Sequence, residues 1–249
     1  MRDGLRSAVA AVSFLTAVPV GRRIEIGARD LLRGTVFFPL VGAVVGAMTA
    51  GVAWAAAAAL PPLPAAVLGV AAGVAVTGAM HLDGLADTAD GVGAVLSGGD
   101  PSTAMHDPRF GVFGGAAIVL DLLLRVSVVS ALVAGPRFPL EAIAAGALGR
   151  AAAIVALGTT PYAGGASGTG AWTRGLGLGR CLVGIAIAST IGVLTVGSTF
   201  GAMAAAALVT VALIRRWSRR HLGGMTGDTL GATIEFSETA ALVAALAVV

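Results

Sequence analysis

The chain has 249 residues, of which 57% are hydrophobic and only 12% are charged, and its mean hydropathy is +0.92. This composition excludes an ordinary soluble domain and indicates a protein whose surroundings are mostly lipid. Despite the formal net charge of +3, we expect no nucleic-acid partner, because the arginines stand beside apolar segments where they set membrane orientation. The single cysteine, Cys181, excludes an intrachain disulfide and a metal site built from several cysteines.

Apolar segments of near-membrane length follow one another along the whole chain. The first, residues 8–20, is shorter than a full span and predicts an N-terminal re-entrant or interfacial helix. The later segments are continuously apolar rather than alternating, which predicts helices that satisfy their own backbone groups in lipid. We expect about seven spanning helices, at residues 35–60, 64–82, 112–134, 139–157, 181–197, 200–214 and 232–249. The predicted fold class is therefore all-α: one polytopic transmembrane helical bundle that forms a single integral-membrane domain over residues 1–249.

Small residues predict close packing between these helices. Gly42, Gly46 and Gly51 would let the first full span approach a neighbour closely. Such small-residue faces also permit a homo-oligomer without requiring one.

The arginines predict the orientation of the bundle. When successive loops are assigned to alternate sides of the membrane, Arg137 falls on one side and nearly all other loop arginines fall on the opposite side. By the positive-inside rule the arginine-rich side is cytoplasmic. We therefore expect a multi-pass protein of the bacterial cytoplasmic (inner) membrane, with its motif-bearing loops facing the cytoplasm.

Residues 81–91 place three carboxylates where a predicted span ends. Asp83, Asp87 and Asp90 fall within about 60° of one another on a helix, so their charges share one face. Such repulsion favours a bound divalent cation, and hard oxygen ligands suit Mg²⁺, with Mn²⁺ as a substitute. The alternative is a solvated cap of the helix, which we rank lower because charge at a membrane boundary is costly. His81 is expected to support a neighbouring carboxylate.

A second motif, residues 105–111, precedes the next predicted span. Asp107 could complete the ligand set of the metal, and Arg109 suits bidentate capture of a phosphate. Arg109 could equally be an anchor that sets orientation.

A third motif, residues 215–231, joins an arginine cluster to a glycine-rich turn. The turn, which contains Thr226, could present backbone amides to phosphate, and Asp228 could contact metal or a ribose hydroxyl. Arg219 or Arg220 could hold a phosphate, or the cluster could serve orientation alone.

Charged residues inside the predicted spans also need an explanation. Glu235 and Glu238 must face the bundle interior, because unpaired carboxylates in hydrocarbon are costly, and we count them among the substrate-binding candidates. Asp121 and Arg125 are spaced for a salt bridge on one helix. Arg150 is expected to reach the two glutamates or a substrate phosphate.

These motifs together resemble the cobalamin synthase family. The segments that carry the resemblance span nearly the whole chain in the right order: residues 14–20, 81–91, 107–111 and 223–228. The chain departs from the family at Ala17 and His106, where basic residues are usual. The resemblance therefore carries no phosphate contact over to these two positions.

The resemblance implies a Mg²⁺-dependent transferase, with adenosylcobinamide-GDP ribazoletransferase activity. It implies that adenosylcobinamide-GDP and α-ribazole, or α-ribazole 5′-phosphate, give adenosylcobalamin, or its 5′-phosphate, and GMP in the last step of nucleotide-loop assembly for vitamin B12. We expect the 5′ oxygen of the ribazole to attack the phosphate that carries cobinamide. On this hypothesis the metal ligands are Asp83, Asp87 and Asp90, with Asp107 as a further ligand or the base, and the phosphates are held by Arg109 with Arg219 or Arg220.

Two other functions fit part of the sequence. An ion or solute transporter would use the intramembrane charges, but its sharpest charged motif should lie near the midplane of the bilayer, and here the densest acids lie at one interface. A lipid-head-group phosphotransferase would share the metal chemistry and differ in substrate.

Overall fold

The computed structural model describes residues 2–20, 24–109, 111–164 and 170–248, and this part of the chain is helical with a single isolated β-bridge. Six of its helices are long and apolar enough to cross a membrane, and a bent helix pair could provide a seventh span. This confirms the predicted polytopic helical bundle. The helices are α1 (Arg2–Leu15), α2 (Ala28–Gly34), η1 (Thr35–Phe37), α3 (Phe38–Ala57), α4 (Pro62–Thr77), α5 (Met80–Leu96), α6 (Pro101–Met105), α7 (Val112–Leu132), α8 (Phe138–Thr159), η2 (Ala171–Gly175), α9 (Leu178–Val196), α10 (Thr199–His221) and α11 (Gly227–Ala247).

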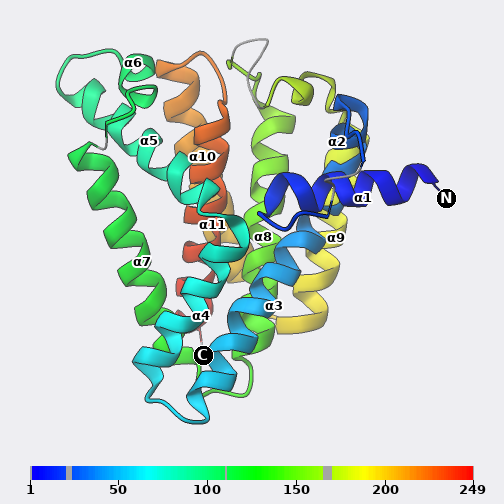
Figure 1. The fold of residues 1–249 in the computed structure, drawn as a ribbon, viewed down its shortest axis with the longest axis vertical. Coiled ribbons are helices and arrows are strands. Elements are labelled where there is room, and N and C mark those ends of the chain that lie inside the picture. The colour runs from blue at the N-terminus through cyan, green and yellow to red at the C-terminus, as the bar shows by residue number, and fades with distance from the viewer. Residues whose placement is uncertain (1, 21–23, 110, 165–169, 249) are drawn as a thin grey trace.

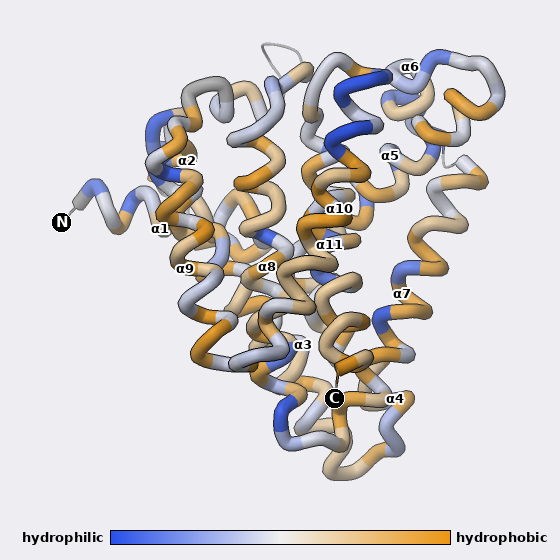
Figure 2. Tube along the Cα trace, turned by 180° about the vertical axis from the view of Figure 1, so that it is seen from behind, coloured by the Kyte–Doolittle hydropathy of each residue, from blue (hydrophilic) through white to orange (hydrophobic). Residues whose placement is uncertain are grey.

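The axes of most long helices are roughly aligned, whereas α1 lies across them (Figure 1). Helix α8 is the most enclosed span, with 78% of its apolar window buried. Figure 2 shows the hydrophilic last turns of α10 at the same end of the bundle as α6. The polar loops that carry the sequence motifs therefore gather at one end.

Glycines set the closest contact between spans, the one between α3 and α8. A Cβ on Gly42 would collide with the carbonyl oxygen of Gly146, and one on Gly46 would collide with that of Ala142. Glycine, which has no Cβ, is therefore required at both positions for α3 and α8 to approach this closely. A Cβ on Gly51 would meet nothing within 4 Å, so its predicted packing role is wrong.

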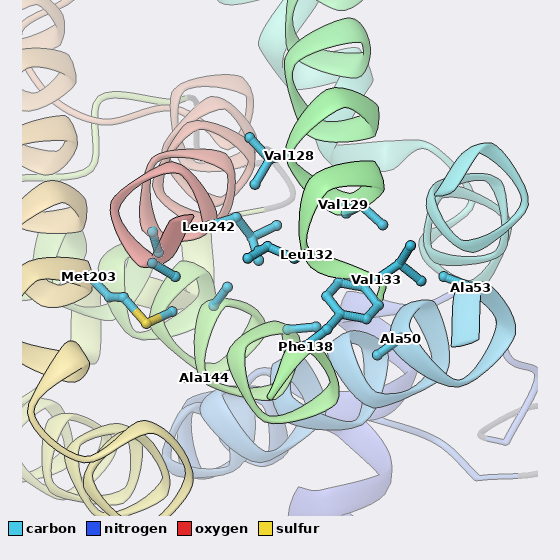
Figure 3. Close-up of a cluster of buried hydrophobic side chains, with 14 of the residues drawn as sticks. Ala50, Ala53, Val128, Val129, Leu132, Val133, Phe138, Ala144, Met203 and Leu242 are labelled. Carbon is cyan, nitrogen blue, oxygen red and sulfur yellow. The ribbon is translucent and has the colours of Figure 1, made fainter. Parts of the chain in front are cut away.

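A hydrophobic cluster fills the opposite end of the bundle from the polar loops (Figure 3). Phe138 of α8 is fully buried there in a cluster with Val129 of α7, Val133 just after α7, Ala50 of α3 and Leu242 of α11. Because lipid tails are as apolar as these side chains, close packing rather than escape from water holds this end together.

The predicted span at residues 64–82 is wrong at its C-terminal end. Helix α4 ends at Thr77, and Gly78 (φ 62°) and Ala79 (φ 58°) both adopt the left-handed conformation. The amide of Ala79 donates to the carbonyl of Val74 at 3.0 Å, which closes the helix end. The chain then turns by 90° into α5. The acidic run therefore lies on a separate helix that starts inside the bundle.

Three other helix ends differ from their predicted positions. The N-terminal helix occupies Arg2–Leu15 rather than residues 8–20, and its position across the bundle fits the interfacial alternative. Helix α10 continues past residue 214 to His221, because its arginines form favourable last turns for a helix dipole. Helix α11 starts at Gly227 rather than 232, since the hydroxyl of Thr226 caps it by accepting from the amide of Thr229.

Candidate active site

Helices α5 and α11 cross where two glycines let their backbones touch. A Cβ on Gly84 would lie 2.7 Å from the carbonyl oxygen of Asp228, and a Cβ on Gly231 would lie 3.2 Å from that of His81. Both distances are too short for a side chain to be accommodated without movement. The crossing therefore holds Asp228, in the first turn of α11, against the acidic face of α5.

Two cavities meet at Gly227 and Asp228. The polar cavity has a volume of about 450 Å³, and the aromatic cavity has a volume of about 410 Å³. The polar cavity is lined mainly by Asp87, His106, Tyr162, His221, Thr226 and Asp228. The aromatic cavity is lined mainly by Phe14, Phe38, Asp83, Trp172, Asp228 and Ile234. The acidic groups thus lie along the boundary between the cavities.

The carboxylates at this boundary are not paired with an arginine side chain. Asp83, Asp87 and Asp228 form no ion pair in the described part of the chain. The charges of Asp228 and Asp83 both repel that of Asp87, and His106 attracts both Asp87 and Asp228. A group of like charges of this kind is stabilised by a bound cation.

Asp90, the third predicted member of the trio, has a different role. One of its carboxylate oxygens accepts from the amide of Gly114 at 2.8 Å, and the other accepts from the amide of Gly111 at 3.1 Å. These amides belong to the start of α7, where backbone donors lack partners within the helix. Asp90 therefore ties α5 to the N-terminus of α7, and metal binding would require it to leave these donors.

Asp107 and Arg109 pair with each other instead of reaching the acidic boundary. The Arg109 guanidinium donates through Nε and Nη2 to the Asp107 carboxylate at 3.0 and 2.7 Å, and 87% of the Arg109 side chain is exposed. This contact lowers the pKa of Asp107 to about 2. Neither residue lines the polar or the aromatic cavity. Their predicted metal and phosphate contacts would need a rearrangement of this loop.

The arginine cluster also lies apart from the acidic boundary. Arg219 and Arg220 line a separate basic hollow on α10, whereas His221, the last residue of that helix, lines the polar cavity. Thr226 lines the polar cavity while its hydroxyl caps α11. Of the predicted third motif, the structure thus brings Thr226 and Asp228 to the site and leaves the two arginines beside it.

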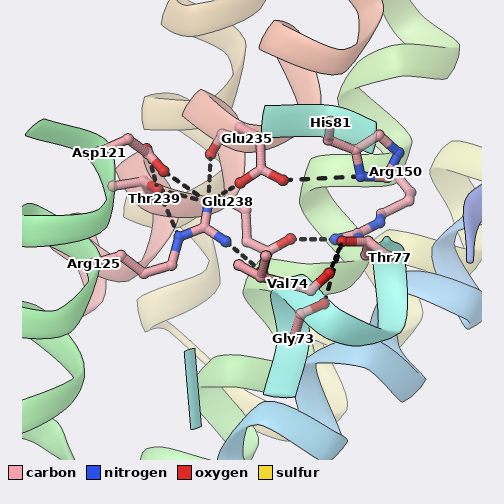
Figure 4. Close-up of polar contacts among 10 residues, drawn as sticks. All are labelled: Gly73, Val74, Thr77, His81, Asp121, Arg125, Arg150, Glu235, Glu238 and Thr239. Atoms are coloured by element: carbon pink, nitrogen blue, oxygen red, sulfur yellow. Dashed lines mark hydrogen bonds and ion pairs between the residues drawn. The ribbon is translucent and has the colours of Figure 1, made fainter. Parts of the chain in front are cut away.

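The intramembrane charges form a buried ionic cluster of Asp121, Arg125, Arg150, Glu235 and Glu238 (Figure 4). Arg125 pairs with Glu235 at 2.5 Å and with Asp121 at 3.4 Å, and Arg150 pairs with Glu238. The predicted pairing of Asp121 with Arg125 and the inward orientation of both glutamates are confirmed. The cavity beside the cluster measures only about 10 Å³, which is too small for a substrate group. The cluster therefore offers no space for a substrate group beside Glu235 and Glu238, and their predicted role in substrate binding stays a prediction.

His81 lies between this cluster and the acidic face of α5. Its side chain is buried, and its Nδ1 lies 3.9 Å from Oε1 of Glu235 (Figure 4). This separation is too long for a hydrogen bond, and Nδ1 has no hydrogen-bond partner among the described residues, so the predicted support of a carboxylate by His81 stays a prediction.

Three residues of the site, Tyr162, Trp172 and His221, were not predicted. The phenol oxygen of Tyr162 accepts from the amide of Gly170 at 3.1 Å, and its loop is pinned to the glycine-rich turn, where the amide of Ala163 donates to the carbonyl of Met225 at 2.8 Å. Tyr162 is the only tyrosine of the chain, and the rarity of tyrosine and tryptophan was the one available signal.

The acidic boundary suits a hard divalent cation. Within the described residues, no three His, Cys, Asp or Glu side chains converge closely enough to hold a metal ion by themselves. Mg²⁺, however, commonly takes only one or two carboxylates and completes its shell with water and substrate phosphates. Asp83, Asp87 and Asp228, which lack ion-pair partners, fit that mode of binding. Ligands that enter from the two cavities would meet there, an arrangement suited to group transfer between them.

Comparison with known proteins identifies the relatives of the chain. A family model described as cobalamin-5-phosphate synthase matches residues 7–246. The adenosylcobinamide-GDP ribazoletransferase of Klebsiella pneumoniae (strain 342) is 35% identical over 97% of this chain and 100% of its own length. Those of Stutzerimonas stutzeri (strain A1501) and Azorhizobium caulinodans are 39% and 37% identical, over 94% and 95% of this chain and 94% of their own lengths. No solved structure matches the chain.

Proposed function

The chain belongs to the cobalamin-5-phosphate synthase family, and on that premise we propose that it is a transferase that joins adenosylcobinamide-GDP to α-ribazole or α-ribazole 5′-phosphate. The last step of cobalamin nucleotide-loop assembly is the corresponding physiological role. The structural observation that carries the proposal is the boundary of Asp83, Asp87 and Asp228, where cavities of about 450 and 410 Å³ meet.

The reaction is a displacement at phosphorus. A ribose hydroxyl of the ribazole attacks the phosphate that carries cobinamide, a new P–O bond forms, the bond to the second phosphate breaks, and GMP leaves. The expected attack through the 5′ oxygen needs correction, because the family description names a 5-phosphate product, and an oxygen that carries this phosphate cannot also form the new link. Another hydroxyl of the ribose is therefore the nucleophile.

The residues of the chain supply alignment and a proton acceptor. Asp87 and Asp228 both line the polar cavity, so the carboxylate of either residue can accept the proton of the attacking hydroxyl. The crossing at Gly84 fixes Asp228 relative to α5, which limits how far the reacting groups can move apart.

Mg²⁺ is the proposed cofactor, and one or two of the carboxylates of Asp83, Asp87 and Asp228 would hold it, with water and substrate phosphates completing its shell. When bound, it would neutralise charge on the phosphates of the donor, which is the main electrostatic demand of phosphoryl transfer. Asp90 and Asp107 are left out of this ligand set because both carboxylates have protein partners.

The proposed location is the bacterial inner membrane, with the site facing the cytoplasm. The polar cavity includes the end of α10, the helix whose last turns are rich in arginine, and such residues are retained on the cytoplasmic side.

The test is reconstitution. Purified protein in lipid, given adenosylcobinamide-GDP, α-ribazole and Mg²⁺, should release GMP together with a cobalamin product. Absence of both products from folded protein would contradict the proposed function. A lipid-head-group phosphotransferase would instead consume a nucleotide-activated lipid, and a transporter would move solute across vesicles without forming either product.

A further inference from the structure

Three aromatic rings from distant parts of the chain form one wall of the aromatic cavity. Phe14 of α1 lies edge-on to Trp172 of η2, with ring centroids 5.2 Å apart and an interplanar angle of 90°. Phe14 also stacks on Phe38 of α3, with centroids 5.8 Å apart and 14° between the planes. Edge-to-face and stacked contacts at these distances make a stable aromatic surface. Another flat ring could extend it.

The remainder of the cavity is apolar at one end and acidic at the other. Leu157, Leu230 and Ile234 continue the apolar lining. Its polar residues are Ser13, His81, Thr173, Asp83 and Asp228, of which Asp228 also lines the polar cavity. A ligand that fits both ends carries an apolar ring at one end and hydroxyl groups at the other.

The two reactants of the proposed reaction differ in the polarity of their bases. The base of α-ribazole is a benzimidazole, a flat and largely apolar bicyclic ring, and its ribose carries hydroxyls. Guanine has an edge of donors and acceptors that must find partners when it is buried. The polar cavity offers such partners in His106, Tyr162 and His221.

From this contrast, and on the basis of the proposed function, we infer that the aromatic cavity is the binding site for the benzimidazole base of α-ribazole, with Phe14 and Trp172 as residues that determine specificity for the base. The guanosine diphosphate end of the donor then occupies the polar cavity. A base in the aromatic cavity directs its ribose toward Asp83 and Asp228. The hydroxyl would then attack phosphorus from the side of the aromatic cavity while GMP leaves into the polar cavity, the opposed arrangement that in-line transfer requires.

This inference gives α1 a role in substrate binding. Phe14 is its penultimate residue, and the following segment is fixed to the end of α4 by a hydrogen bond of 2.8 Å from the amide of Ala17 to the carbonyl of Val76. The N-terminal helix is therefore a wall of the acceptor site as well as an interfacial helix.

Steady-state kinetics test the inference. Phe14→Ala and Trp172→Leu should each raise KM for α-ribazole by about 5- to 150-fold, the range expected for loss of one aromatic contact with a base. KM for adenosylcobinamide-GDP should stay within about twofold. The matched control is Trp54→Leu, because Trp54 lies on α3 with 63% of its surface exposed and lines neither cavity; it should change neither KM. An unchanged KM for α-ribazole, or a rise confined to the donor, would overturn the assignment.

A binding experiment keeps this inference separate from the proposed function and from misfolding of the variants. In a chain whose other tryptophans are replaced by phenylalanine (Trp54→Phe, Trp217→Phe), the fluorescence of Trp172 should be quenched saturably by α-ribazole and by free 5,6-dimethylbenzimidazole, but not by GMP. Quenching without turnover would support the assignment of the base site and contradict the proposed function. Turnover without quenching would support the proposed function and contradict the assignment of the base site.

Discussion

Gly84 of α5 lies against the backbone of Asp228 of α11, and no side chain fits between them. A Cβ at position 84 would be 2.7 Å from the carbonyl oxygen and 3.0 Å from the Cα of Asp228. The obstacle is backbone rather than a flexible side chain, so the helices themselves must move if this position grows. The position of Asp228 in the acidic boundary therefore depends on a residue that carries no functional group.

Gly84→Ala should reduce turnover by at least about tenfold and lower the free energy of unfolding by about 1–3 kcal/mol, as overpacking does. Gly51→Ala is the matched control, because it is also a glycine in a helix but its new Cβ would meet nothing within 4 Å. Alanine at that position should be neutral or slightly stabilising. GMP release and thermal unfolding in the same detergent measure both effects. Equal behaviour of the two variants would show that the crossing is not tight.

Asp87→Asn should lower kcat by about 10²-fold or more while leaving the protein folded. The substitution removes one of several mutually repelling carboxylates, so the free energy of unfolding without metal should be unchanged or higher. The control is Asp3→Asn, a surface residue with 79% of its side chain exposed, which should keep full activity. Chelation of divalent cations should abolish turnover of the wild type, and added Mg²⁺ should restore it. Full activity of Asp87→Asn would remove this carboxylate from the mechanism.

Local spacing predicted those features of the site that depend on one helix. The acids at 83, 87 and 90 do share α5, and Asp121 does pair with Arg125 one turn later. Both follow from helical geometry alone. The family resemblance placed the motifs in the correct order, but it could not say which side chains would meet.

The remaining features of the site depend on contacts between segments that are distant in the sequence. Asp90 caps α7 because that helix begins beside α5, and Arg125 binds Glu235 because α7 packs on α11. The two left-handed residues, Gly78 and Ala79, broke a hydrophobic pattern that predicted an uninterrupted helix. A hydropathy pattern carries no information on such a break when the residues themselves are small and apolar.

Arg125→Met should destabilise the protein by about 3–5 kcal/mol, because it leaves buried carboxylates without their cation. Adding Glu235→Gln should recover part of the loss, since the double variant buries one uncompensated charge fewer. Thermal unfolding of the two single variants and the double variant measures the coupling. Strict additivity would mean that the ion pair between Arg125 and Glu235 contributes no interaction energy.

Membrane orientation can be tested with single cysteines. In a Cys181→Ala background, which removes the one buried native thiol, cysteine is introduced at Gly99, in the exposed turn before α6, or at Ala134, in the exposed turn after α7. These turns flank a single span, so they must lie on opposite sides of the membrane. The arginine bias predicts that position 99 is cytoplasmic and position 134 periplasmic. A maleimide that cannot cross the membrane should therefore label Ala134→Cys in intact cells, and Gly99→Cys only in inverted vesicles. The reverse pattern would place the acidic boundary on the periplasmic side, where it could not receive a cytoplasmic nucleotide-activated donor, and would contradict the proposed location.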